Sequence, residues 1–202
     1  MTKILFCTLC FIYFPLASYS QDEWTFYKTQ DDVSLWIKDV PGSKLSQFKL
    51  ETTVRSNLAS FYRILHDVEN MSAWYDKVKS VRLLKKLSDT EAIYLLEYNL
   101  PFPFENRVST VKGSMIFDRQ SNLVRIITEY YPYEIPESFQ GKPVINIIKS
   151  YWEVTDNKNG TIKIIHSGYM DPGGNIPVWL TNEGVTSTPF KTIRNLKKLL
   201  KA

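Results

Sequence analysis

The order in which apolar periodicity changes along the chain is the feature that most constrains its fold. Residues 33–40 and 46–55 alternate between apolar and polar side chains, which is typical of half-buried strands. Through residues 56–78 the apolar side chains instead recur every three or four positions, which predicts a helix capped by Ser56 or Asn57. Six further strand-like stretches follow, at residues 79–87, 92–100, 107–118, 122–131, 144–155 and 161–170. This order predicts an antiparallel sheet of about eight strands, which is too twisted to stay flat and should curve.

Helical segments are expected at both ends of this pattern. Residues 22–29, which carry Trp24 and Phe26, are predicted to form a short opening helix. Near the C-terminus, Pro189 should interrupt whatever helix precedes it. The apolar face of the last helix is predicted to consist of Phe190, Ile193, Leu196 and Leu200. The opposite face carries Lys191, Arg194, Lys198 and Lys201. A curved sheet has a concave face that must be covered, and this helix is the predicted cover.

The first twenty residues have the layout of a cleaved secretory signal. Lys3 precedes an apolar run over residues 4–16, and small residues follow ahead of Gln21. The run is too short to cross a membrane as a helix, which needs about 20 apolar residues. The sequence therefore predicts a signal peptide over residues 1–20 and an exported protein, either periplasmic or secreted.

Residues 21–202 have a suitable length for one domain with a single core. Cys7 and Cys10 both fall in the predicted signal peptide, so the domain should contain no disulfide, thiolate metal site or cysteine nucleophile. The net charge of +4 is mild, and nucleic acid is therefore not an expected partner. His66 and His166 lack the spacing of metal ligands, and no hydrolase, nucleotide or dinucleotide motif is present. No metal or cofactor is expected.

Four stretches, in this order, resemble the START domain, a lipid-transfer fold of the helix-grip class. They are SNLASFYRILHDVENMSAWYDKV at 56–78, PFPFENR at 101–107, KSYWEVT at 149–155 and, most specifically, DPGGNIPVWLTN at 171–182. One departure is that Val108 follows Arg107, where the family usually has an aspartate. The resemblance covers essentially all of residues 24–200. It implies an α+β helix-grip fold, in which a curved antiparallel sheet wraps around a long C-terminal helix and encloses a hydrophobic cavity.

The function implied by this resemblance is the binding of one hydrophobic molecule, such as a lipid or a sterol, in an internal tunnel. Such domains usually do no chemistry, so the expected role is that of a carrier or sensor. Burial of an apolar chain contributes roughly 0.8 kcal/mol per methylene, so few polar contacts are needed. A monomer is expected. The cationic face of the last helix is either an ordinary solvated face or a surface for transient contact with a membrane.

The ligand-contacting residues are predicted on the same basis. Glu97 and Lys112, on neighbouring strands, either form a pair inside the cavity or an ordinary exposed cross-strand pair. A helix capped by Asn175 would place Ile176 and Trp179 on one face, directed at the cavity or packed in the core. The predicted contacts are Glu97, Lys112, Trp152, His166, Trp179, Val185 and Phe190.

Two other functions remain open at this level. The wider superfamily includes polyketide cyclases and aromatases, for which the candidate residues would be Glu97, Lys112, His166 or Tyr98. The chain shows no acid and base at a recognisable spacing, so the leading hypothesis assigns no catalytic residue. An adaptor whose cavity is merely core is the third alternative.

Overall fold

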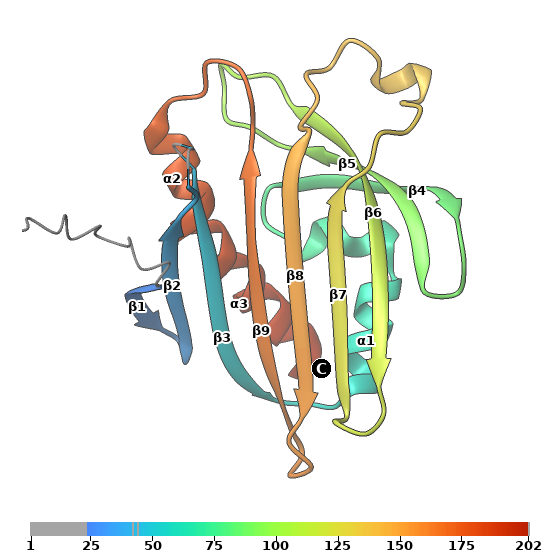
Figure 1. The fold of residues 1–202 in the computed structure, drawn as a ribbon. Helices are drawn as coiled ribbons and strands as arrows, with labels where there is room; N and C mark the ends of the chain where they lie inside the picture. The colour runs from blue at the N-terminus through green and yellow to red at the C-terminus, as the bar shows by residue number, and fades with distance from the viewer. Residues whose placement is uncertain (1–23, 42, 44, 202) are drawn as a thin grey trace, which may run out of the picture.

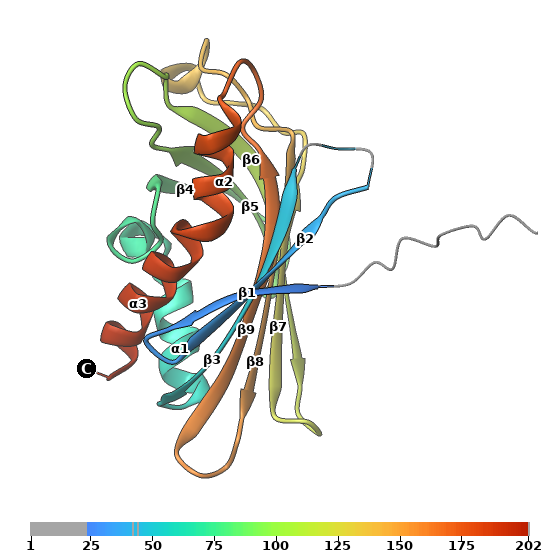
Figure 2. The same ribbon diagram turned by 90° about the vertical axis from the view of Figure 1, so that its left-hand side faces the viewer.

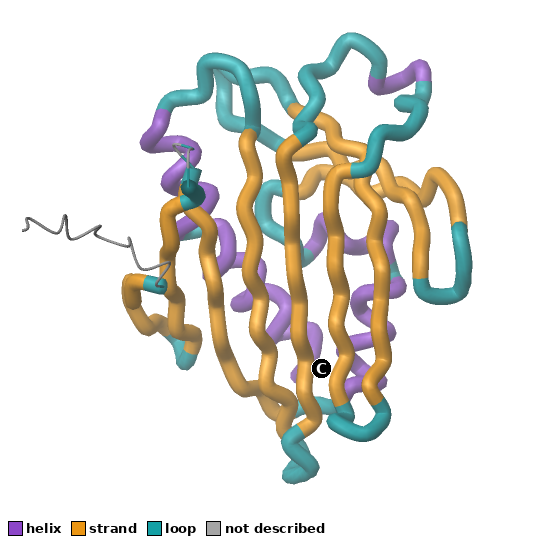
Figure 3. Tube along the Cα trace, in the orientation of Figure 1, coloured by secondary structure: helices purple, strands orange, loops and turns teal. Residues whose placement is uncertain are grey.

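The computed structural model describes residues 24–41, 43 and 45–201. The predicted signal peptide lies outside these residues and stays a prediction. In the described part, nine antiparallel strands form one sheet, and the α-helices lie on one of its faces (Figures 1 and 3). No helix among these residues is both long and apolar enough to cross a bilayer. The α+β fold class is therefore as predicted.

The strands are β1 (Thr25–Gln30), β2 (Val33–Asp39), β3 (Ser46–Arg55), β4 (Val78–Lys86), β5 (Glu91–Tyr98), β6 (Arg107–Asp118), β7 (Leu123–Tyr130), β8 (Ile147–Asp156) and β9 (Thr161–Asp171). The helices are α1 (Leu58–His66), α2 (Val178–Thr186) and α3 (Thr188–Lys201), with the short 3-10 helices η1 (Val68–Ala73) and η2 (Glu137–Phe139). In the sheet the order is β1-β2-β3-β9-β8-β7-β6-β5-β4, so the last strand pairs with the third. Viewed from the side, α1, α2 and α3 pack against the concave face of the curved sheet (Figure 2).

The predicted opening helix is wrong, because the first described segment is the edge strand β1. β1 pairs with β2 across a two-residue turn formed by Asp31 and Asp32. Both residues have positive φ angles, 53° and 60°, as the tight turns that join antiparallel strands require. Aspartate tolerates this conformation better than most residues, so the Asp-Asp pair was a hairpin signal. This strand raises the number in the sheet from the predicted eight to nine.

The remaining elements follow the predicted periodicity closely. The side-chain oxygen of Asn57 accepts a hydrogen bond from the Ser60 amide at 2.9 Å and caps α1, which resolves the choice between Ser56 and Asn57. The C-terminal helix is broken as predicted: α2 ends at Thr186, and Pro189 lies in the first turn of α3. Proline suits this position because the first-turn amides of a helix have no intrahelical acceptor.

The main core lies between α3 and strands β2, β3, β8 and β9. The predicted apolar face of α3 is confirmed, since Phe190, Ile193, Leu196 and Leu200 are all buried there. The opposite face is exposed, and Arg194 bonds to Asp31 of the β1–β2 turn at 2.9 Å. The α3 helix is therefore held at both faces, whereas the preceding α2 helix covers a hollow region of the sheet.

Candidate functional site

Two adjacent cavities occupy the space between the concave face of the sheet and the helices. The α2 cavity has a volume of about 150 Å³ and lies between α2 and strands β3, β8 and β9. The α1 cavity has a volume of about 600 Å³ and lies between α1, η1 and strands β4 to β8. Four residues line both: Tyr75, Tyr98, Ile148 and Ser150. The cavities are therefore neighbouring compartments that share this part of their walls.

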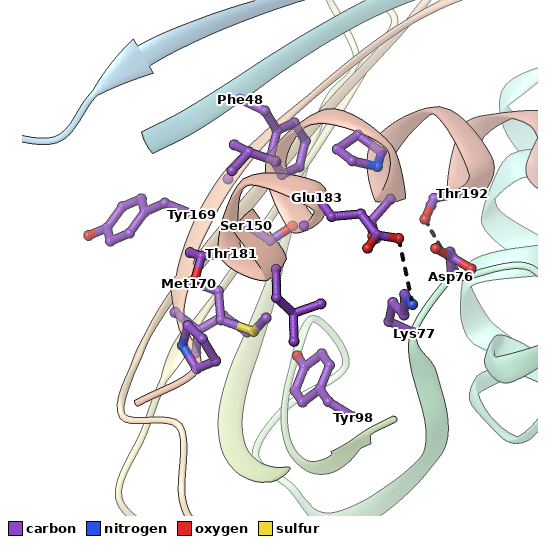
Figure 4. Close-up of a pocket in the computed structure, with 18 of the residues that line it drawn as sticks. Phe48, Asp76, Lys77, Tyr98, Ser150, Tyr169, Met170, Thr181, Glu183 and Thr192 are labelled. Atoms are coloured by element: carbon purple, nitrogen blue, oxygen red, sulfur yellow. Dashed lines mark hydrogen bonds and ion pairs between the residues drawn. The ribbon is translucent and has the colours of Figure 1, made fainter. Parts of the chain in front are cut away.

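The α2 helix forms one wall of the smaller compartment (Figure 4). Leu180 and Val185 of α2 line it and are buried, which agrees with the predicted position of Val185. Phe190, in contrast, lines neither compartment. It lies within the main core, with the Lys28 ammonium 4.7 Å from its ring centroid. Its neighbours Thr188 and Pro189 line the α2 cavity, whereas Phe190 packs into the core, so the predicted inward position of Phe190 is wrong.

Trp179 was predicted to face the cavity, and this is also wrong. Its side chain is 64% exposed and lines neither compartment. The prediction assumed a helix that begins at Asn175 and so groups Trp179 with Ile176. The α2 helix instead begins after Pro177, its N-cap, so Ile176 is not helical. Ile176 still lines the α2 cavity, together with Leu180.

The predicted pair of Glu97 and Lys112 does not form. In the β5–β6 register, Glu97 lies opposite Val108, and Lys112 lies opposite Ile93. The neighbours of Glu97 along β5, Leu96 and Tyr98, line the α1 cavity, so Glu97 lies on the other face of the sheet. Lys112 lies on that same outer face and bonds to Glu91 at 3.2 Å. Strand alternation grouped these residues correctly but did not tell which face was concave.

Glu97 instead fastens the long β7–β8 connection to the outer face of the sheet. Its carboxylate accepts hydrogen bonds from Lys142 of that connection at 3.0 Å and from Lys79 at 3.2 Å. Asn106 and Ser80 donate to it at 3.3 Å each. Burial acts to raise the pKa of Glu97, but the bonds from Lys142, Lys79 and Asn106 outweigh it and lower the pKa below 4.5. This carboxylate has a structural role away from the cavity.

Trp152 and His166 lie where the two compartments meet. The two rings are stacked at 3.7 Å between centroids with 12° between their planes, and Trp152 lines the α1 cavity while His166 lines the α2 cavity. The edge of Phe48 packs against His166 at 4.9 Å. Ser150 Oγ lies 3.2 Å from His166 Nε2, and the Tyr75 hydroxyl lies 3.5 Å from the same atom. These positions agree with the predicted placement of Trp152 and His166 on the cavity wall.

The polar groups at this junction are uncharged at neutral pH. Burial lowers the pKa of His166 from 6.5 to about 3 and leaves Nδ1 without a hydrogen-bond partner among the described residues. Burial raises the pKa of Tyr75 to about 12, against a smaller lowering by its bond with Ser150. Burial, with a smaller contribution from the nearby Tyr75, raises the pKa of Tyr98 well above 10. The junction therefore offers hydroxyl groups and an imidazole but no charge.

Sequence analysis missed Ser150 and Tyr75 at this junction. Ser150 precedes Trp152 by two positions on β8, so both share the inward face, and a polar residue among apolar ones on such a face was an available signal. Tyr75 follows η1, outside any regular helix or strand, and no periodicity indicated its direction.

The chain resembles known proteins in sequence and in structure, although no family model matches it. An uncharacterized protein of Pseudomonas aeruginosa is 23% identical over 176 residues, which cover 87% of this chain and 86% of that protein. Among solved structures, a STAR-related lipid transfer protein from Xanthomonas axonopodis superposes with a TM-score of 0.79 and 26% identity, over 89% of this chain and 99% of that one.

Two human proteins show the same fold at lower identity. STARD10 gives a TM-score of 0.75 with 17% identity, over 88% of this chain and 73% of that one. StAR-related lipid transfer protein 5 gives 0.73 with 11% identity, over 91% and 88%. The architecture is therefore the helix-grip fold of START domains. The resemblance inferred from the four sequence stretches is confirmed for the fold.

Proposed function

We propose that this protein binds a single hydrophobic molecule, such as a lipid or a sterol, in its internal space. The observation that carries the proposal is the α1 cavity, whose volume of about 600 Å³ lies within the range of about 300 to 1,000 Å³ usual for ligand sites. Its walls include apolar side chains from five strands, among them Leu96, Val111, Ile126 and Trp152. Solved structures with this fold include a protein of similar length described as a lipid transfer protein.

The proposed role is that of a carrier or sensor, with α2 as the element that opens. The turn before α2 contains Gly173 and Gly174, both with positive φ, which few other residues adopt. Arg107 ties this turn to the β5–β6 connection, because its Nε donates to the Pro172 carbonyl at 3.1 Å and its Nη1 to the Glu105 carbonyl at 2.7 Å. A break at Ser187 separates α2 from the anchored α3. Motion of α2 between these two points would admit the ligand.

A non-enzymatic role is favoured over the cyclase-like alternative. Two of the candidate catalytic residues, Glu97 and Lys112, lie on the outer face of the sheet. A general base works best with a pKa near the operating pH, whereas that of His166 is about 3. Among the four candidates, only His166 and Tyr98 therefore line the cavities, and neither is tuned for proton transfer at neutral pH.

Filling the α1 cavity is expected to weaken ligand binding without loss of the fold. Thr128 lines this cavity from β7, and Thr128→Trp should weaken binding of added phospholipid or sterol at least about 10-fold, because the indole takes the space of the ligand. Native mass spectrometry should find a lipid-sized mass on the wild-type protein, and lipid should raise its melting temperature.

The matched control is Ile127→Trp, since Ile127 is the next residue on β7 and points to the opposite face. This variant should bind as the wild type does. The proposal fails if the wild type carries no lipid-sized mass and no added lipid changes its melting temperature. It also fails if both tryptophan variants bind lipid normally.

The second part of the proposed role is that the protein acts outside the cytoplasm. This part rests on the predicted signal peptide over residues 1–20. Full-length protein produced in a Gram-negative host is expected in the periplasmic fraction, and a variant without residues 1–20 in the cytoplasm. Equal distribution of the two proteins between the fractions would contradict export.

A further inference from the structure

The junction of the two cavities is polar, although the walls on either side are largely apolar. Of the four residues that line both cavities, Tyr75, Tyr98 and Ser150 carry hydroxyl groups. His166 lies beside them, at 3.2 Å from Ser150 Oγ. We call Tyr75, Tyr98, Ser150 and His166 the polar waist. These residues come from β5, β8, β9 and the segment after η1, so the group exists only in the folded chain.

Part of the hydrogen-bonding capacity of the polar waist is unused. The Tyr98 hydroxyl makes no hydrogen bond with any described residue, although the side chain is buried and lines both cavities. The Tyr75 hydroxyl is already engaged, by a bond with Ser150 and by a 3.5 Å contact to His166 at the long limit of a hydrogen bond. Figure 4 shows Tyr98 and Ser150 among the side chains that surround the smaller cavity. Buried hydroxyl groups normally have partners, so the Tyr98 hydroxyl is the group left to bond with a ligand.

The chemistry of the missing partner follows from the residues of the polar waist. Tyrosine and serine hydroxyls can each donate and accept, so they suit a hydroxyl or a carbonyl oxygen. None of the four side chains carries a charge at neutral pH, so a buried ionic group would find no counter-charge there. Apolar space extends in both directions, towards Leu180 and Val185 on one side and towards Val111 and Ile126 on the other.

We propose that the polar waist binds an uncharged hydroxyl or ester group in the middle of the ligand, with one apolar arm in each cavity. This inference rests on the proposed function and narrows its ligand class to neutral lipids with an internal polar group, such as diacylglycerols. The larger arm occupies the α1 cavity of about 600 Å³, and the shorter one the α2 cavity of about 150 Å³.

Dioctanoylglycerol and hexadecane are the probes that separate this inference from simple apolar binding. Binding can be followed by tryptophan fluorescence, because Trp74 and Trp152 line the α1 cavity. Tyr98→Phe and Ser150→Ala should each weaken dioctanoylglycerol binding about 5- to 10-fold, through loss of one hydrogen bond to the ester group. Binding of hexadecane should change less than about 2-fold, because it forms no hydrogen bond.

The matched control is Tyr133→Phe, which removes a hydroxyl from a side chain that is 37% exposed and lines neither cavity. It should leave the affinity for dioctanoylglycerol within about 2-fold of the wild type. The inference is overturned if Tyr133→Phe has the same effect as Tyr98→Phe, or if neither waist variant distinguishes the two probes. If the wild type binds neither probe, the proposed function itself fails.

Discussion

Acidification from about pH 7.5 to about pH 5 is expected to reduce the free energy of unfolding of this protein by about 2 kcal/mol. The cause is His166, which is 1% exposed and stacked on Trp152. Burial lowers its pKa from 6.5 to about 3, so between these values the unfolded chain binds a proton that the folded chain does not. The contribution of neutral His166 to stability is therefore complete above pH 6.5 and decreases as the pH falls towards 3.

Urea unfolding at several pH values measures this effect, and the sequence contains a convenient control. His66 is the other of the two histidines and is exposed. His66→Gln should retain the pH dependence, whereas His166→Phe should flatten it between about pH 7.5 and pH 5. His166→Gln serves the same purpose if the phenylalanine variant does not fold. Carboxylates with a lowered pKa, such as Glu97, reduce the stability only when the pH falls to about 4.5 and below. An unchanged slope in both His166 variants would contradict this account.

Trp152→Ala is expected to reduce the free energy of unfolding by about 3 to 5 kcal/mol. Trp152 is 4% exposed and contacts three other aromatic rings besides His166. Its ring centroid lies 6.1 Å from those of Phe61 and Trp74 and 6.4 Å from that of Tyr75. Truncation removes these contacts and enlarges the α1 cavity, which Trp152 lines. The neighbouring side chains cannot move in to fill the added volume, so its full cost remains.

Trp179→Ala is the matched control for this substitution. Trp179 is 64% exposed, so its truncation should change the free energy of unfolding by less than about 0.5 kcal/mol. Chemical unfolding of both variants at neutral pH tests the pair. Equal losses at the two positions would show that Trp179 is packed, contrary to its position in the structure.

Much of the fold could be predicted from the local pattern of the sequence. The bounds of β3 and β6, the cap at Asn57 and the helix break before Pro189 all follow from alternation, capping preference and the geometry of proline. The missed strand β1 shows the limit of this approach. Its six residues are exposed throughout, so no burial pattern marks them, and pairing with β2 through the Asp31–Asp32 turn defines the strand.

The candidate site was harder to predict from the sequence than the fold. Periodicity shows which residues share a face of a strand or helix, but not which face lines the cavity. Glu97 and Lys112 share a face as predicted, but this face is the outer one and does not line the cavities. Trp179 was assigned to the wrong side because the phase of a helix depends on its first residue, and α2 begins three positions after Asn175. His166 and Trp152, which the START resemblance suggested as ligand contacts, do line the cavities.

The sequence by itself determined most of the strands and helices after β1, their order and the likeness to START domains, because these depend on residues close together in the chain. The tertiary structure alone decided which face of each strand lines the cavity and which side chains meet there. The polar waist joins residues that are far apart in the sequence, since 91 positions separate Tyr75 from His166. The pairing of β8 with β9 brings Ser150 beside His166, and the curvature of the sheet brings in Tyr98 and Tyr75, because contact between distant residues depends on how whole elements pack.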